Sequence, residues 1–149
     1  MSTGIETVDI IDPWLYATLS GDAQLVELVG QNIGGPLLGG DVAPPYVTWS
    51  EPSVRDVTAQ DGGRIWVDTI YTVKGVAATA SWDDVAPIAR RIDALLHGER
   101  GVEHTSAAGH ITSVREGVVQ YGEQADGQQY RHLGGRFRIR AHSLPALAD

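Results

Sequence analysis

The chain has 149 residues, of which 20% are charged, and its formal net charge is −8. This length suits one domain of the usual size, about 100–150 residues, so we expect residues 1–149 to form a single domain. The absence of cysteine excludes thiolate catalysis, disulfides and Cys-based zinc sites, and the acidic balance argues against a dedicated DNA-binding domain. No apolar run approaches the roughly 20 residues of a transmembrane helix, and the acidic segment Met1–Asp12 lacks the basic residues of a secretory signal, so we expect a soluble protein without membrane contacts.

The charges are unevenly distributed along the chain. Residues 1–63 hold nine acids and one base, a net −8; residues 64–128 hold nine acids and six bases, a net −3; residues 129–149 hold one acid and four bases, a net +3. Oppositely charged segments can neutralise each other within one fold. They can also face neighbouring subunits in a ring, where different surfaces meet.

The N-terminal part predicts two short helices. Asp12-Pro13 combines an N-cap acceptor with proline at the first helical position. Ser20-Gly21 ends this first helix. Asp22 can cap a second helix that runs through Val29.

Residues 31–45 are rich in glycine and proline and predict a loop. No Lys-Ser/Thr follows these glycines and no strand precedes them, which argues against a phosphate-binding P-loop. After the loop, Tyr46–Trp49 predicts a strand, and a further extended piece is expected at Val54–Ala59. Asp61-Gly62-Gly63 predicts a turn, and residues 64–73 then alternate with period two, the clearest strand in the chain.

The segment Trp82–His97 predicts the main helix. Ser81 with Asp84 has the spacing of a capping box, and Gly98 is placed to end the helix. Apolar residues recur at three- and four-residue intervals, so this helix should pack across the sheet; they are Val85, Ile88, Ala89, Ile92, Leu95 and Leu96.

A long hairpin completes the chain, with arms at about Ile111–Tyr121 and Gln129–His142 and a connection that contains Gly122 and Asp126-Gly127. The element order indicates the α+β class. We predict an antiparallel sheet of about four strands, formed by two hairpins, with a long helix packed on one face and short N-terminal helices.

Residues for catalysis or metal binding are not arranged in a recognisable pattern. None of the five histidines forms the i, i+4 pair with Glu that a helical zinc site requires, and His104 and His110 only flank a loop. Asp83-Asp84 is explained by helix capping and the helix dipole. A Gly-x-Ser-x-Gly elbow and a dinucleotide fingerprint are both missing. We predict that the protein is not an enzyme and has no cofactor or metal.

The return strand of the last hairpin places Arg136, Arg138 and Arg140 on one face. These arginines could be solvated or paired with acids on neighbouring strands, such as Asp68 or Glu116. They could also bind an acidic partner, either a neighbouring subunit or a DNA backbone, since the planar guanidinium can bind carboxylate or phosphate in a bidentate manner.

Trp66 shares a strand face with Arg64 and Asp68. It could pack beneath the loop at 31–45, or lie in a subunit contact, where aromatic residues are enriched. The candidate residues for a subunit or partner interface are Arg136, Arg138, Arg140, Trp66 and Asp68.

In its organisation the chain resembles the tail-completion family of long-tailed phages, small proteins also called tail terminators or tail-to-head joining proteins. The resemblance covers most of the chain and lies in arrangement, without a catalytic motif. It is carried by Trp14–Leu19, Asp22-Ala23, Pro45–Val47, Trp66–Val73, Ala86–Leu96 and Arg136–Arg140.

The resemblance implies a structural virion protein, assembled in the host cytoplasm, that forms a ring, commonly a hexamer, at the head-proximal end of the tail. The ring would cap the tail tube, stop its growth and offer a joining surface to the head. Its partners would be other copies of the chain, the tail tube protein and the head–tail connector protein. DNA would pass through the channel without specific binding, and arginines in the lumen would retard it, so we expect Arg136, Arg138 and Arg140 at a subunit or tube contact.

Two alternatives remain. Within virion assembly, the chain could be another head–tail connector or neck protein, or a tail-tube subunit, which the neighbouring genes would distinguish. In a different class, it could be a small ligand-binding or hydrolytic α+β domain. A chain that stays monomeric at high concentration would favour that class.

Overall fold

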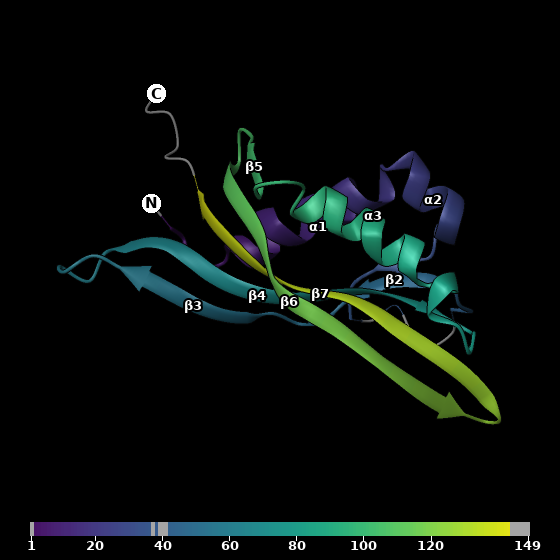
Figure 1. The fold of residues 1–149 in the computed structure, drawn as a ribbon. Helices are drawn as coiled ribbons and strands as arrows, with labels where there is room; N and C mark the ends of the chain where they lie inside the picture. Colours follow the sequence, from purple (N-terminus) through teal and green to yellow (C-terminus); the bar gives the residue numbers. More distant parts are fainter. Residues whose placement is uncertain (1, 37, 39–41, 144–149) are drawn as a thin grey trace.

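A computed structural model describes residues 2–36, 38 and 42–143 of the chain. It is built on one twisted, curled sheet of seven strands with all helices on the same side (Figure 1). The sheet order is β1-β2-β4-β7-β6-β5, and β3 pairs with β4 off this path. Within the described ranges, no helix has the length and apolar character needed to cross a membrane.

Three long strands form the centre of the sheet, and four short ones lie around them. Neighbouring strands are antiparallel except β1 and β2, which are parallel. The strands are β1 (Ile33–Gly34), β2 (Tyr46–Trp49), β3 (Ser53–Thr58), β4 (Arg64–Ala77), β5 (Val102–Thr105), β6 (Gly109–Ala125) and β7 (Gln128–Ser143).

The helices are short. They are the π-helix η1 (Thr7–Ile11), α1 (Asp12–Ser20), α2 (Ala23–Val29), the 3₁₀ turn η2 (Trp82–Asp84) and α3 (Ala86–Leu96). The two N-terminal helices lie where the sequence predicts them, with Pro13 in the first turn of α1. The prediction that Asp12 is the N-cap is wrong, because the chain is already helical in η1 and Asp12 is the first residue of α1. The Asp22 carboxylate accepts a hydrogen bond from the Leu25 N–H at 2.9 Å and caps α2.

The predicted fold class is wrong in three respects: the sheet has seven strands rather than about four, it is mixed rather than antiparallel, and no helix of the described residues is longer than the 11 residues of α3. The predicted helix Trp82–His97 divides because Pro87 favours the first turn of a helix, so α3 begins at Ala86. The preceding residues tighten into η2, where the Ser81 hydroxyl accepts a hydrogen bond from the Asp83 N–H. Strands β1 and β5 are too short to show a period of two, and pairing with a neighbouring strand holds them in place.

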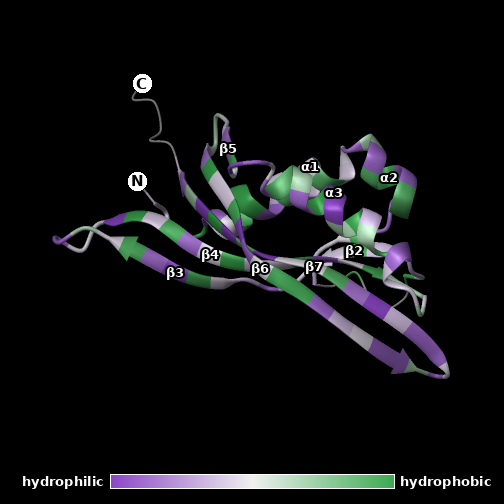
Figure 2. Ribbon diagram, in the orientation of Figure 1, coloured by the Kyte–Doolittle hydropathy of each residue, from purple (hydrophilic) through white to green (hydrophobic). Residues whose placement is uncertain are grey.

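The core lies between the helices and one face of the sheet. Figure 2 shows apolar and polar residues alternating along β4, β6 and β7, which leaves one face of each strand for burial. Tyr71 and Phe137 are the largest fully buried side chains. The Tyr71 hydroxyl donates to the Asp12 carboxylate at 2.9 Å, and burial together with this negative charge raises the pKa of Tyr71.

Helix α3 rests directly on β4 because Gly75 has no side chain. A Cβ at this position would lie 2.4 Å from Cγ2 of Ile88, well inside contact distance. At the C-terminal end of the same helix, the buried Ser113 hydroxyl of β6 donates to the Leu96 carbonyl at 2.6 Å. The helix is therefore held to the sheet by close packing at one end and by a hydrogen bond at the other.

The hairpin of β6 and β7 extends beyond the rest of the sheet (Figure 1). Strand β4 pairs with β7 only as far as Arg131, whereas β6 and β7 continue to pair up to Ala125 and Gln128. The hairpin closes at Asp126-Gly127, where both residues have positive φ, as the Asp-Gly turn signal predicts. We refer to residues 122–131 as the projecting hairpin.

Candidate functional site

The candidate interface residues lie on the sheet face opposite the helices, which we call the open face. Because successive side chains of a strand point to opposite faces, the buried residues Tyr71 and Phe137 assign the odd-numbered positions of β4 and β7 to the helix side. The even-numbered positions then form the open face. The strand register places Asp68 opposite Arg140 on one side and Arg55 on the other.

Asp68 is the centre of this face. Only 4% of the residue is exposed, and its Oδ2 accepts from Nη1 of Arg138 at 2.7 Å and from Nη2 of Arg55 at 3.3 Å. The Nε atom of Arg140 lies 3.6 Å from Oδ1. A buried carboxylate is costly unless it is paired, and Asp68 is surrounded by three guanidinium groups.

Arg138 also bonds Glu116, and this hydrogen bond, aided by the charge of Asp68, raises the pKa of Arg138. The structure therefore contains the intramolecular pairs with Asp68 and Glu116 that the strand periodicity allows. These pairs position Arg138 within the chain.

Arg136 and Arg140 form fewer polar contacts within the chain than Arg138 does. Both are exposed, and within the described part of the chain neither guanidinium forms a hydrogen bond; the 3.6 Å approach of Arg140 to Asp68 is its one ion pair there. Together with Arg55 and Arg138, they place four positive charges around Asp68, against the two negative charges of Asp68 and Glu116. This part of the open face is thus positive on a chain whose net charge is −8.

Trp66 lines a pocket of about 190 Å³ at the end of the open face. The other lining residues come from β6 and β7; they are His110, Thr112, Arg140, Ala141 and His142. The indole Nε1 of Trp66 is buried and has no hydrogen-bond partner among the described residues. Trp66 therefore shares this pocket with residues of β6 and β7, and its lining includes no residue of the described part of the loop at 31–45.

The pocket brings together residues that sequence reasoning did not connect. His110 and His142 are register partners whose ring centroids lie 5.5 Å apart, and Thr112 pairs with Arg140. The sequence indicates one part of this grouping, since the alternation along the return strand places His142 beside Arg140. The partner strand and its register were needed to add His110 and Thr112.

The remaining polar groups considered in the sequence do not converge. His104 lies near Trp14, with ring centroids 6.3 Å apart, whereas His110 bonds Thr105 on the neighbouring strand. Asp84 is bonded by the Thr79 hydroxyl at the start of η2. Over residues 2–36, 38 and 42–143, no three His, Asp or Glu side chains are close enough to hold a metal ion.

A buried histidine lies at the base of the projecting hairpin. The ring of His132 stacks on Tyr121 with centroids 4.3 Å apart, and Nε2 lies 3.0 Å from the Glu123 carboxylate. Burial lowers the pKa of His132, while Glu123 opposes this shift. This cluster joins the two strands where the projecting hairpin leaves the body.

Strand β6 has two exposed apolar side chains before it reaches the projecting hairpin. Val118 is 57% exposed and Tyr121 is 42% exposed. Strand β5 pairs with β6 only between His110 and Ser113, so the rest of that edge of β6 has no neighbouring strand among the described residues. Exposed apolar side chains beside an unpaired strand edge are typical of surfaces that meet another chain.

Comparison with known proteins gives a family match and matches to solved structures. The sequence model of the family described as "Tail completion protein gp17" matches residues 13–142. A chain from a solved structure described as "Virion of native gene transfer agent (GTA) particle" is similar in fold, with a TM-score of 0.63 and 19% sequence identity, over 85% of this chain and 90% of that chain. No curated protein matches the sequence.

Proposed function

Because the chain belongs to the tail completion protein gp17 family, whose model covers residues 13–142, we propose that it forms a ring that caps the tail tube. Family membership makes the protein a structural component that takes part in assembling a phage-type virion tail. The finer proposal is that the ring stops tube growth and joins the tail to the head connector. This role requires no catalytic step.

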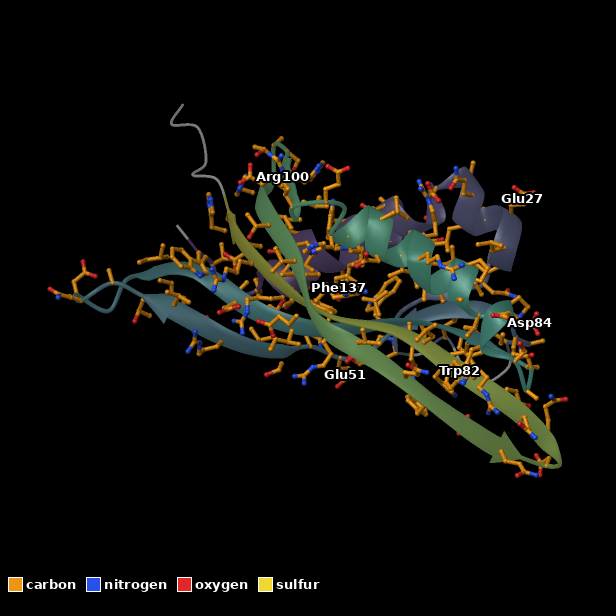
Figure 3. The ribbon with its side chains drawn as sticks, in the orientation of Figure 1. Glu27, Glu51, Trp82, Asp84, Arg100 and Phe137 are labelled. Carbon is orange, nitrogen blue, oxygen red and sulfur yellow. The ribbon has the colours of Figure 1, made fainter. Side chains whose placement is uncertain are left out.

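The observation that best supports a ring is the separation of positive and negative charge on the surface of the folded chain. Subunits with a net charge of −8 repel one another unless surfaces of opposite sign meet. The open face supplies a positive surface through Arg136, Arg138 and Arg140. Some exposed acids lie away from these arginines, and Figure 3 shows Glu27 and Asp84 at the end of the molecule away from β5. Different surfaces that attract each other are what a head-to-tail ring needs.

The same charges suggest where DNA would pass. An acidic channel wall lets DNA move without adsorption, whereas arginines in the lumen would retain it. We therefore propose that Arg136, Arg138 and Arg140, together with Trp66 and Asp68, face a neighbouring subunit or the tube. Acidic residues of other surfaces would line the lumen of the ring.

A tube-polymerisation assay tests this function. Purified tail tube protein is polymerised with and without the full chain, and tube lengths are measured by electron microscopy. We expect the protein to fix the length, to appear as a density at one tube end, and to be required before isolated tails join filled heads. If tube lengths do not change but tails prepared without the protein fail to join heads, the protein is a connector or neck protein. If the protein is incorporated along the tube, it is a tube subunit.

A further inference from the structure

We propose that strand β3 of a second copy of this chain adds to the free edge of β6, so that the sheets of neighbouring copies become continuous. This inference rests on the proposed ring and names the contact that would join its subunits. Three observations support it: two unpaired strand edges, an apolar groove beside one of them, and the matching residues that the two edges present.

The sheet has two unpaired strand edges at opposite ends of the molecule (Figure 1). At one end β3 pairs only with β4, so its outer edge has no neighbouring strand in the described part of the chain. At the other end β5 pairs with β6 only as far as Ser113, and the Arg115 N–H donates to Nδ1 of His97 at 3.0 Å. The outer edge of residues 117–125 then has no neighbouring strand among the described residues. Edges at opposite ends cannot pair within one chain, so their pairing between copies is head-to-tail.

The composition of both edges suits the addition of a strand. Lysine and proline, which commonly protect exposed strand edges from pairing, are absent from β3 and from residues 117–125. Val54 on β3 is 46% exposed and Val118 on β6 is 57% exposed. Each edge therefore presents backbone groups together with an exposed apolar side chain.

Val54 and Val118 lie on the same side of the sheet. Val54 pairs with Thr69 of β4, and cross-strand partners share a face. Val118 pairs with Gly135 of β7. Both partners are odd-numbered positions on the helix side. An antiparallel strand that sets Val54 opposite Val118 therefore keeps both valines on one face and continues the alternating strand directions of the sheet.

A groove on the helix side of β6 can receive the valine of the added strand. The groove lies between α3 and strands β6 and β7 and has a volume of about 290 Å³. A strand added to the edge of β6 directs every second side chain toward this side, as in peptide recognition by strand addition. The apolar walls of the groove are formed by Ala86, Ala89, Val118, Leu133 and Phe137.

The groove is positively charged at its rim. Arg90 and Arg115 line it together with a single acid, Asp93. Arg115 lies 3.4 Å from Asp93, and its side chain is 39% exposed. An exposed pair of this kind is weak, so the guanidinium can bind a second carboxylate. The groove therefore favours a strand that carries an acid close to its apolar residue.

Strand β3 meets this requirement with Asp56. It follows Val54 by two residues, so both lie on the helix side, and its ion pair with Arg64 is exposed. A one-residue bulge in β6 makes Arg115 the helix-side neighbour of Val118. The register that joins the two valines therefore brings Asp56 toward Arg115. Apolar residues and opposite charges match in the same register, which identifies β3 as the occupant.

Disulfide cross-linking of the full chain tests the contact, because the sequence has no cysteine of its own. Val54→Cys and Val118→Cys copies are mixed under oxidising conditions, with and without tail tubes. Facing residues of antiparallel strands are about 4.5–5.5 Å apart at Cα, within the range of a disulfide, so we expect a linked dimer in the mixture and little in either variant alone.

Two matched controls accompany this experiment. Arg55→Cys changes the neighbouring residue of β3, which pairs with Asp68 on the open face, and it should cross-link to Val118→Cys far less than Val54→Cys does. Val8→Cys replaces another exposed valine, on η1, and should give no cross-link to Val118→Cys.

Sedimentation velocity tests the charges of the same register. Asp56→Arg and Arg115→Asp should each weaken self-association by about tenfold or more, because like charges then meet. The double variant should recover association to within about threefold of the wild-type chain, since the opposite charges are restored. Circular dichroism verifies that each variant is folded.

The outcomes separate the inference from the proposed function. A ring that forms without the cross-link between positions 54 and 118, and without a response to charge reversal, contradicts strand addition and leaves the ring intact. A wild-type chain that stays monomeric with and without tail tubes contradicts the ring itself. If Val118→Cys cross-links to cysteine variants of the tail tube protein and not to Val54→Cys, the tube occupies this edge and the inference is overturned.

Discussion

Replacing Asp68 by Asn tests whether the open face is held together by its buried carboxylate. The substitution keeps the shape of the side chain and removes the charge that accepts from Arg138 at 2.7 Å and Arg55 at 3.3 Å. A hydrogen bond to a charged group contributes about 1.5–3 kcal/mol. The Arg55 bond adds little, since 75% of that side chain is exposed and water screens it. We therefore expect a loss of about 2–3 kcal/mol in the free energy of unfolding.

Thermal and urea unfolding followed by circular dichroism measure this loss. For a domain of this size, 1 kcal/mol shifts Tm by about 2–4 °C, so Asp68→Asn should lower Tm by about 4–12 °C. Asp56→Asn is the matched control, because Asp56 pairs with Arg64 at 3.2 Å and both side chains are about half exposed. Its effect should stay within about 1 kcal/mol. If both variants unfold alike, the reasoning about the Asp68 cluster is refuted.

Three further predictions concern the packing of the helices, and urea unfolding measures each of them. Gly75→Ala should cost about 1–3 kcal/mol because its Cβ would overlap α3, whereas Gly117→Ala, which meets nothing within 4 Å, should be neutral; equal effects would contradict the close approach of the helix. Ser113→Ala should cost about 1–3 kcal/mol, because the buried carbonyl at the end of α3 loses its donor; an unchanged midpoint would show that this bond does not matter. The hydrogen bonds from Arg91 hold the pKa of Asp22 below its usual 3.8, so the stabilisation by Asp22 is present above that pH and is lost as the pH falls through the lower, folded value. Asp22→Asn should therefore be less stable than wild type at pH 7, with a difference that shrinks below about pH 4; a difference independent of pH would contradict this linkage.

The alternation of residues along the chain predicts the open face well. Period two along β4 and β7 places Arg136, Arg138 and Arg140 together and points to Asp68 and Glu116 as partners for them. The capping signal at Asp22 likewise identifies the start of α2. Such predictions succeed because they depend on side-chain direction and on backbone chemistry within a few residues.

Features that depend on pairing between distant segments could not be predicted. Strand β1 has two residues in a Gly/Pro-rich segment and exists because it lies parallel to β2. The pocket joins Trp66 to His110 and His142, and only the register of three strands brings them together. A register shift of one residue would turn these side chains to the other face of the sheet, and the sequence of one strand does not specify its register.

The most direct test of the account is a cryo-electron microscopy reconstruction of complete tails. We expect a ring of this chain at the head-proximal end of the tube, with Arg136, Arg138 and Arg140 at a contact with a neighbouring subunit or the tube and acidic residues toward the channel. Finding the chain along the tube or at the distal tip, or finding these arginines lining the channel, would contradict it.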